Sequence, residues 1–309
     1  MSKQYLKNFN KGVITALVTP LTKDLNIKCE VIKDLIEFQI KNDIKGFFIL
    51  GTYGEGIALH PNKRKLFTEK FIEYVPSNIP IIVNVTTPSI ELTLELARHA
   101  ADVGANAISS LPPLYYKPDL KGLIMYFSQL SKIDIPIFVY NNPPKQEYDI
   151  SLTVFERIFS EVNNIVGVKD SSGVPERIQL LVKKFKDKYF IAAAKDSIVL
   201  QAFLFGADAH ICGLSNAFPE LATAIYKAVI NGRIDLAVKL QSLLTTIREI
   251  LKSFGLESSA LVKEVMKLRG IDVGYPAPPN RPLDEDELIK LRNKLTPILN
   301  EVENLLKKT

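Results

Sequence analysis

Residues 166–173 read Val-Gly-Val-Lys-Asp-Ser-Ser-Gly, and the interpretation of the whole chain starts from this stretch. The apolar, β-branched run at residues 165–168 predicts a strand with turn residues after it. Lys169 would then stand at the carboxyl end of a buried strand, where its ammonium group loses hydration. Burial lowers the pKa of a lysine, and a neutral amine can attack a ketone to form an imine. The residues alone leave an alternative, in which Lys169 extends into water or pairs with Asp170.

Seven further runs of the same kind alternate with amphipathic stretches, which predict helices. The predicted strands are residues 13–18, 46–50, 79–85, 107–111, 135–140, 165–169, 190–194 and 209–213. The predicted helices are residues 30–42, 61–74, 90–103, 121–131, 152–161, 175–185, 197–205 and 219–231. Continuous apolar strands between helices indicate a parallel sheet covered on both faces, and eight such units predict an α/β fold of the closed (β/α)8 TIM-barrel type. The alternative is an open doubly wound sheet, but no G-x-G-x-x-G pattern follows the first strand.

The pattern changes after residue 231. Residues 234–254 and 257–268 predict helices, the proline-rich bridge 270–282 predicts turns, and residues 284–308 predict a last long helix. We therefore expect a catalytic barrel at residues 1–231 and a C-terminal three-helix extension at residues 232–309.

Composition narrows the class of protein. The 309 residues include 39 basic and 34 acidic side chains, a mild net charge of +5 that suits an anionic metabolite. Basic and aromatic residues do not interleave as in a nucleic-acid groove, and no apolar run approaches membrane-spanning length. The sequence therefore predicts neither a nucleic-acid partner nor a membrane segment. Cys29 and Cys212 lie far apart, which favours reduced thiols in a cytoplasmic protein. The three histidines have no metal-ligand spacing.

Active sites of such barrels lie at the carboxyl ends of the strands. The second predicted strand ends in the glycine-rich turn 51–56, whose backbone N–H groups can hold a carboxylate or a phosphate. Tyr140 ends the fifth strand, beside the strand that carries Lys169, and its phenol can carry a proton to or from an imine. Taken singly, a tight turn explains the glycines about as well, and Tyr140 alone favours a rim tyrosine with its ring in the core. The fourth strand leads into the proline-rich segment 112–118, and the eighth ends at Gly213.

Together these features resemble the pyruvate-dependent class I aldolases and lyases. This is the family of dihydrodipicolinate synthase, N-acetylneuraminate lyase and 2-keto-3-deoxygluconate aldolase. The resemblance covers residues 12–282, and its markers occur in the order and on the strands expected. The markers are the turn 51–55, the segment 113–118, Tyr140-Asn141 followed by Pro143, and Gly167-Val168-Lys169-Asp170.

The resemblance implies a role for several residues. Lys169 would form the Schiff base with pyruvate, and Tyr140 would carry protons. Thr52 would connect that tyrosine to the bulk solvent for proton exchange. Tyr115 would reach a neighbouring subunit's site. Gly51, Thr52 and Tyr53 would hold the substrate carboxylate, and Gly213 would lie against the bound substrate. The resemblance also implies a homotetramer, a dimer of dimers, that needs no cofactor and no metal.

Two departures from the family bear on the substrate. Tyr53 replaces the second threonine of the family's Gly-Thr-Thr-Gly turn. Lys145 stands where the synthase branch has an arginine for the second carboxylate of its aldehyde, and a lysine cannot supply the same bidentate grip. The predicted partners for substrate hydroxyl groups are Tyr53, Asn142, Ser215 and backbone groups near Gly213.

We therefore expect an aldehyde-lyase that splits 2-keto-3-deoxygluconate into pyruvate and glyceraldehyde. The first alternative is 4-hydroxy-tetrahydrodipicolinate synthase, which condenses pyruvate with aspartate semialdehyde. A dehydratase of keto-deoxy sugar acids and a barrel that binds a keto acid without turnover are further alternatives.

Overall fold

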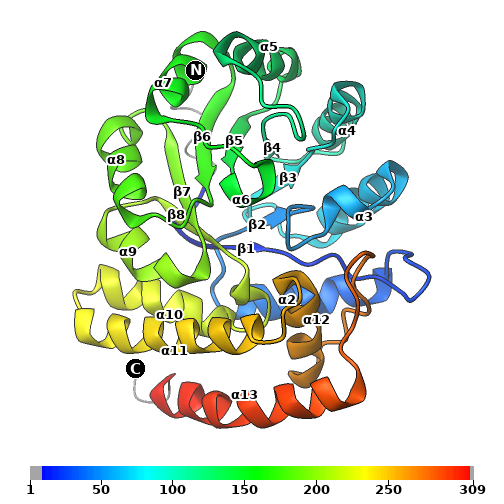
Figure 1. Cartoon of the computed structure of the whole chain (residues 1–309), viewed down its shortest axis with the longest axis vertical. Coiled ribbons are helices and arrows are strands. Elements are labelled where there is room, and N and C mark those ends of the chain that lie inside the picture. Colours follow the sequence, from blue (N-terminus) through cyan, green and yellow to red (C-terminus); the bar gives the residue numbers. More distant parts are fainter. Residues whose placement is uncertain (1–8, 307–309) are drawn as a thin grey trace.

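The computed structural model describes residues 9–306. Eight parallel strands follow one another around a closed barrel, and helices connect them (Figure 1). The strands are β1 (Gly12–Ala16), β2 (Gly46–Ile49), β3 (Ile81–Asn84), β4 (Ala107–Ser110), β5 (Ile137–Asn141), β6 (Ile165–Asp170), β7 (Phe190–Ala194) and β8 (Ala209–Cys212). The predicted (β/α)8 TIM-barrel fold is confirmed.

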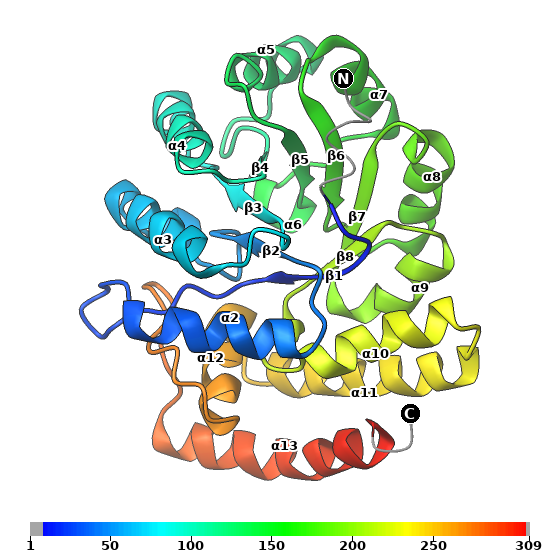
Figure 2. The same ribbon diagram turned by 180° about the vertical axis from the view of Figure 1, so that it is seen from behind.

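The connecting helices surround the barrel and begin where the sequence places start signals (Figure 2). Pro61, Pro175 and Pro219 occupy the first helical turn of three of them, and serine or aspartate side chains cap three others. The helices are α2 (Ile32–Lys41), α3 (Pro61–Tyr74), α4 (Ile90–Asp102), α5 (Leu120–Leu130), α6 (Pro143–Gln146), α7 (Leu152–Glu161), α8 (Pro175–Phe185), α9 (Val199–Leu204) and α10 (Pro219–Ile230).

Four short 3-10 helices complete the connections: η1 (Cys29–Val31), η2 (Gly56–Ala58), η3 (Asp196–Ile198) and η4 (Leu214–Asn216). The sequence does not predict α6, η2 or η4 as helical. The helix predicted at residues 197–205 is divided into η3 and α9, because the backbone of Ile198, with φ −128° and ψ 23°, leaves the helical range between them.

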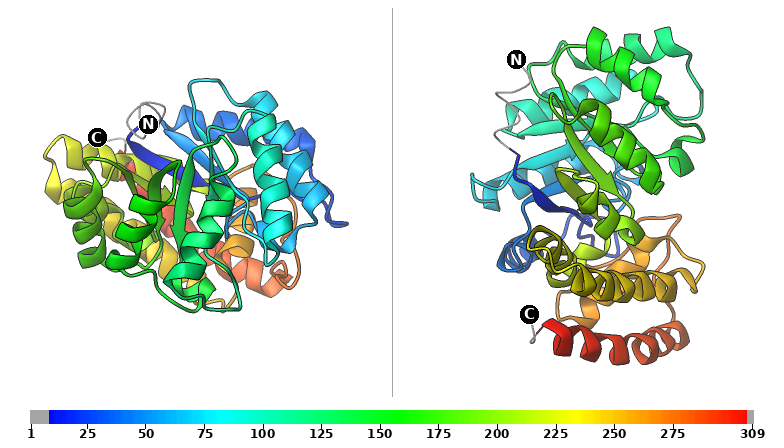
Figure 3. Two further views of the ribbon diagram at one scale, coloured as in Figure 1. Left: turned by 90° about the horizontal axis from the view of Figure 1, so that it is seen from above. Right: turned by 90° about the vertical axis from the view of Figure 1, so that its left-hand side faces the viewer.

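Three helices follow the barrel: α11 (Ile234–Lys252), α12 (Ser258–Leu268) and α13 (Glu285–Leu306). The predicted end of the last helix at residue 308 lies outside the described residues. Helix α11 lies alongside α10, and α13 lies beyond α11 at one end of the molecule (Figures 1 and 3). Buried side chains of α11, α12 and α13 belong to the same apolar cluster as those of the barrel. The division of the chain at residue 231 stays a prediction.

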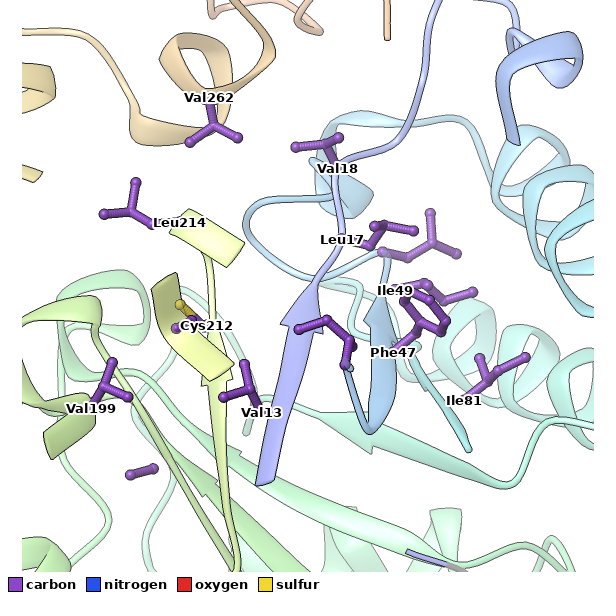
Figure 4. Close-up of a cluster of buried hydrophobic side chains, with 14 of the residues drawn as sticks. Val13, Leu17, Val18, Phe47, Ile49, Ile81, Val199, Cys212, Leu214 and Val262 are labelled. Carbon is purple, nitrogen blue, oxygen red and sulfur yellow. The ribbon is translucent and has the colours of Figure 1, made fainter. Parts of the chain in front are cut away.

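Two apolar clusters hold the barrel together. One fills its interior, where the rings of Phe9 and Phe138 pack edge to face with centroids 5.1 Å apart. The other lies between strands and helices, and Figure 4 shows part of it. In that view Val262 of α12 points toward Val18 and Leu214, which follow β1 and β8. Helix α12 therefore packs over the carboxyl ends of the strands, the edge at which barrel active sites form.

Candidate active site

Lys169 lies near the carboxyl end of β6, paired in register with Tyr140 of β5 and Ala192 of β7. Its side chain is buried, and its Nζ lies 3.6 Å from the ring centroid of Phe48 and 4.1 Å from that of Tyr140. Burial lowers the pKa of the Lys169 amine, against the opposing effect of Tyr140. This environment increases the fraction of neutral amine, which is the form that attacks a carbonyl carbon.

The phenol of Tyr140 lies among three polar side chains. Its oxygen lies 3.2 Å from Thr52 Oγ1 and accepts a hydrogen bond from Asn142 Nδ2 at 2.9 Å. Burial raises the pKa of Tyr140, but the charge of Lys169 and hydrogen bonds from Thr52, Ser171 and Asn142 outweigh it, so the pKa is lowered. A phenol beside an amine, with a hydroxyl behind it, can pass a proton to and from a reacting oxygen.

Tyr53 crosses from the turn after β2 to the end of β8. Its hydroxyl donates to Asp196 Oδ2 at 3.2 Å, and its ring lies against Gly213. A Cβ atom on Gly213 would meet that ring at 2.1 Å, so this close approach requires glycine. Burial and Asp196 raise the pKa of Tyr53, which keeps its phenol neutral.

Asp196, directly after β7, organises the end of β8. Its Oδ1 accepts hydrogen bonds from the backbone N–H groups of Gly213, at 2.8 Å, and Leu214, at 3.1 Å. The same oxygen accepts from the Cys212 thiol at 3.0 Å. One buried carboxylate thus joins the turn after β2 to the loop after β8, and both of its oxygens accept hydrogen bonds.

These side chains surround a cavity of about 140 Å³ at the carboxyl end of the barrel. Most of the predicted site residues line it: Thr52, Tyr53, Tyr140, Asn142, Lys145, Lys169 and Gly213. The cavity brings a buried amine, a phenol and several hydrogen-bonding groups within reach of one small molecule.

Three predicted site residues lie elsewhere. Gly51 lines a neighbouring cavity of about 290 Å³, which shares Thr52 and Lys145 with the first. The hydroxyl of Ser215 is buried and donates to Thr15 Oγ1 and to the carbonyl of Cys212. Tyr115 is 90% exposed. The roles of all the predicted site residues, in the cavity or outside it, stay predictions.

The cavity also has residues that the sequence analysis does not identify: Ser171, Lys195, Asp196, Arg248, Glu257, Ser258 and Ser259. Lys195 and Asp196 directly follow β7, so the rule applied to the other strand ends points to them as well. Lys195 has a φ of 83°, and its carbonyl accepts a hydrogen bond from His210 Nε2 at 3.0 Å. A positive φ is strained for a residue other than glycine, and strained residues of this kind cluster at ligand-binding and active sites.

Ser171 directly follows β6, so the same rule points to it. The remaining missed residues come from the C-terminal helices, and no local sequence pattern indicates that these helices reach the cavity. Arg248 lies on α11, and Glu257 to Ser259 lie at the start of α12. Glu257 Oε1 accepts from Lys145 Nζ at 2.6 Å, so the loop after β5 and the start of α12 are joined at the cavity.

Within residues 9–306, no group of three or more histidine, cysteine, aspartate or glutamate side chains is placed to hold a metal ion. In the same part of the chain, no helix has the length and apolar character needed to cross a membrane.

Comparisons with known proteins agree with this arrangement. Residues 9–298 match the model of the dihydrodipicolinate synthetase family. The curated 4-hydroxy-tetrahydrodipicolinate synthase of Methanopyrus kandleri is 30% identical over 287 residues, which cover 92% of this chain and 95% of that protein. An uncharacterized DapA-like lyase of Thermococcus onnurineus is also 30% identical, over 94% of this chain and 99% of that protein.

Solved structures give the same fold. A variant of the 2-keto-3-deoxygluconate aldolase of Sulfolobus solfataricus superposes with a TM-score of 0.88 at 29% identity, covering 96% of this chain and 98% of that one. A prophage protein of the dihydrodipicolinic acid synthase family from E. coli K12, in complex with pyruvate, gives a TM-score of 0.87 at 26% identity, over 93% of this chain and 98% of that one.

The barrel places a buried strand-end lysine beside a tyrosine, as expected for a lysine-dependent aldolase, and the chain belongs to the dihydrodipicolinate synthetase family. Within that family it is a pyruvate-dependent class I aldolase, a lyase. The family's enzymes form a Schiff base between a lysine and pyruvate and use no metal cofactor.

Proposed function

We propose that this aldolase cleaves and forms 2-keto-3-deoxy sugar acids, splitting 2-keto-3-deoxygluconate into pyruvate and glyceraldehyde. Lys169 attacks the C2 ketone, and water leaves to give an iminium. Tyr140 takes the proton of the C4 hydroxyl, and the C3–C4 bond breaks. Its electron pair moves to the iminium and forms an enamine, and glyceraldehyde departs. Protonation at C3 and hydrolysis return pyruvate and the free amine.

The observation that carries the choice of substrate is the ion pair between Lys145 and Glu257. By the family resemblance, Lys145 stands where the synthase branch has an arginine for a second carboxylate, and its amine lies 2.6 Å from Glu257 Oε1. Asn142, Ser258 and Ser259 line the same cavity and can bind hydroxyl groups. A site built to bind hydroxyls rejects a substrate that lacks them, because its polar groups stay unpaired.

The synthase reaction is the second candidate. Several curated relatives carry the name 4-hydroxy-tetrahydrodipicolinate synthase. Lys195 and Arg248 line the cavity and can attract the carboxylate of aspartate semialdehyde.

The test is kcat/KM for glyceraldehyde and for aspartate semialdehyde, each with pyruvate fixed. We expect glyceraldehyde to be preferred by roughly 100-fold, the value of a missing bidentate charge-assisted contact of a few kcal/mol. The variant Lys145→Arg should reduce the ratio of kcat/KM for glyceraldehyde to that for aspartate semialdehyde. The variant Glu257→Gln, which releases Lys145, should reduce this ratio less. Preference of the unmodified enzyme for aspartate semialdehyde would make the synthase the correct assignment.

For the assembly of the chain, we propose a homotetramer in which Tyr115 approaches a neighbouring subunit's site. The exposed aromatic pair Tyr115 and Tyr116 supports it, because such a surface is costly to leave in water. We propose a cytoplasmic location, supported by the free thiols of Cys29 and Cys212.

A further inference from the structure

An ion pair buried on both sides joins the C-terminal helices to the turn after β2. Lys263 Nζ of α12 lies 2.6 Å from Glu55 Oε2, and the two side chains are 0% and 2% exposed. The partners are 208 residues apart in the chain. Removing two charges from water is costly, so a buried pair is weak evidence for stability and calls for another explanation.

The pair also fixes the bridge between α12 and α13. Glu55 Oε1 accepts from the backbone N–H of Ala277 and from Asn280 Nδ2, each at 3.0 Å. Lys263 Nζ donates in addition to the carbonyl of Tyr275 at 2.7 Å. Every charge-bearing atom of the pair therefore has a partner, and the geometry around it is fully determined.

The bridge itself has little freedom to move. The backbone N–H of Tyr275 donates to the carbonyl of Leu21 at 2.9 Å. Gly274 has a φ of 81°, and a Cβ atom there would lie 1.8 Å from that same carbonyl oxygen. Contacts with α12 and with the bridge, which packs on the loop after β1, thus hold Glu55 in place.

Glu55 belongs to the turn that supplies Thr52 and Tyr53 to the cavity. Its N–H donates to the carbonyl of Thr52 at 3.1 Å, and its φ of 52° is in the left-handed region. A glutamate keeps such a conformation only where its surroundings hold it. Its position therefore sets where Thr52 lies relative to Tyr140.

We propose that the Lys263–Glu55 pair is a positioning device for catalysis, through which α12 holds Thr52 at hydrogen-bonding distance from Tyr140. Helix α12 has two links with the barrel around the cavity, since Glu257 at its N-terminal boundary pairs with Lys145. The inference rests on the proposed proton-relay role of Thr52 and Tyr140. Lys263 and Glu55 would position this relay although neither residue lines the cavity beside Lys169.

The test is Lys263→Met in the full chain, with three measurements. We expect kcat to fall roughly 10- to 100-fold, because a small misplacement of a catalytic group costs up to about 100-fold. The yield of the borohydride-trapped pyruvate adduct on Lys169 should stay at one per chain. The KM for pyruvate should rise by a smaller factor than kcat falls, because the Lys169 amine is unchanged and only Thr52, one of three residues expected to hold the pyruvate carboxylate, is displaced.

Two further variants keep the test decisive if Lys263→Met folds poorly. Glu55→Asp keeps the charge but shortens the arm by one methylene, and should lower kcat about tenfold. The double variant Glu55→Gln/Lys263→Met leaves no unpaired charge, so it should recover folding but not kcat. The control is Lys184→Met, whose ion pair with Glu156 at 2.7 Å also joins two helices, α8 and α7, but is exposed on both sides and does not reach the turn. It should keep kcat within about twofold.

The outcomes separate the two proposals. Folded Lys263→Met and Glu55→Asp variants with normal kcat and only a lower melting temperature would show a purely structural pair and overturn the inference. Absence of the adduct in the unmodified enzyme would instead overturn the proposed function.

Discussion

At the scale of single residues, the surroundings of Lys169 favour the neutral form of its amine. An exposed lysine is almost wholly protonated near neutral pH. Lys169 is enclosed by the rings of Phe48 and Tyr140 and has no carboxylate partner among the hydrogen bonds and ion pairs of residues 9–306. Aromatic faces attract a cation only modestly, so burial dominates and the amine loses its proton more easily.

We expect Lys169 to form the covalent intermediate. Pyruvate with borohydride should leave one reduced adduct per chain, located at Lys169 by peptide mass spectrometry. The variant Lys169→Ala should lose both the adduct and the activity, whereas Lys195→Ala, which removes another cavity lysine, should keep the adduct. An adduct on a different lysine would contradict the mechanism.

The rate of adduct formation should depend on pH in a defined direction. Only the neutral amine attacks, so the rate rises with pH and becomes constant above the pKa of Lys169. Because burial lowers this pKa from its ordinary value of 10.5, the plateau should begin below that pH. The measurement is the single-turnover rate of imine formation across pH. A rate that still rises above pH 10.5 would contradict the effect of burial.

Replacing Tyr140 by phenylalanine should separate the binding of pyruvate from proton transfer. The variant keeps the ring over Lys169 but removes the hydroxyl between Thr52 and Asn142. We expect kcat for aldol cleavage to fall roughly 10²- to 10⁴-fold, the usual value of a positioned acid–base group. The adduct should still form. Near-normal cleavage would mean that another group carries the proton.

At the scale of secondary-structure elements, the site depends on contacts between the ends of neighbouring and distant strands. Tyr53, from the turn after β2, spans to the end of β8 and to Asp196 after β7. The link is possible because Gly213 has no side chain where the ring passes. The position of this turn is therefore set by the ends of β7 and β8 as well as by β2.

The variant Gly213→Ala should displace the Tyr53 ring. Its new Cβ would lie 2.1 Å from that ring, so the tyrosine must move and lose its hydrogen bond to Asp196. We expect a loss of about 1–3 kcal/mol in the free energy of unfolding, the usual cost of overpacking, together with a lower kcat. The control is Gly213→Ala in a Tyr53→Thr background, where the ring is absent and the added methyl should cost little. An equal loss in both backgrounds would exclude this contact as the cause.

At the scale of the whole molecule, two of the C-terminal helices contribute side chains to the cavity. Buried residues of α11 and α12 belong to the cluster between strands and helices, and Arg248, Glu257 and Ser258 line the cavity. The barrel and the predicted extension thus share one core. A deletion of residues 232–309 would remove part of the site as well as the cover of the barrel.

Assembly should be measurable through Tyr115. This residue is 90% exposed and has a φ of 72°, a conformation that costs energy for a tyrosine. We expect Tyr115→Phe to keep the tetramer, measured by sedimentation, and to lower kcat roughly 10- to 100-fold if its hydroxyl serves a neighbour's site. Tyr116→Phe is the matched control and should keep kcat. A fully active monomer would contradict the shared site.

The sequence predicts the barrel closely because its signals are local. Apolar runs and helix caps act over a few residues, so most strands and helices end within two residues of the predicted bounds. The same local reasoning brings Lys169 and Tyr140 together, because adjacent parallel strands end at one edge. It does not predict α6, since four residues carry too little periodicity, or the break before α9.

The sequence by itself thus determines the eight-unit barrel, the strand-end lysine and the tyrosine beside it, since each follows from patterns along a short stretch of chain. Only the tertiary structure decides which distant residues complete the cavity. Glu257 reaches Lys145, Tyr53 reaches Asp196, and Lys263 reaches Glu55 across 208 residues. The physical reason is that such pairs form only after the helices pack and exclude water. The spacing of apolar residues along the chain therefore cannot predict these contacts, because burial of the whole core brings their partners together.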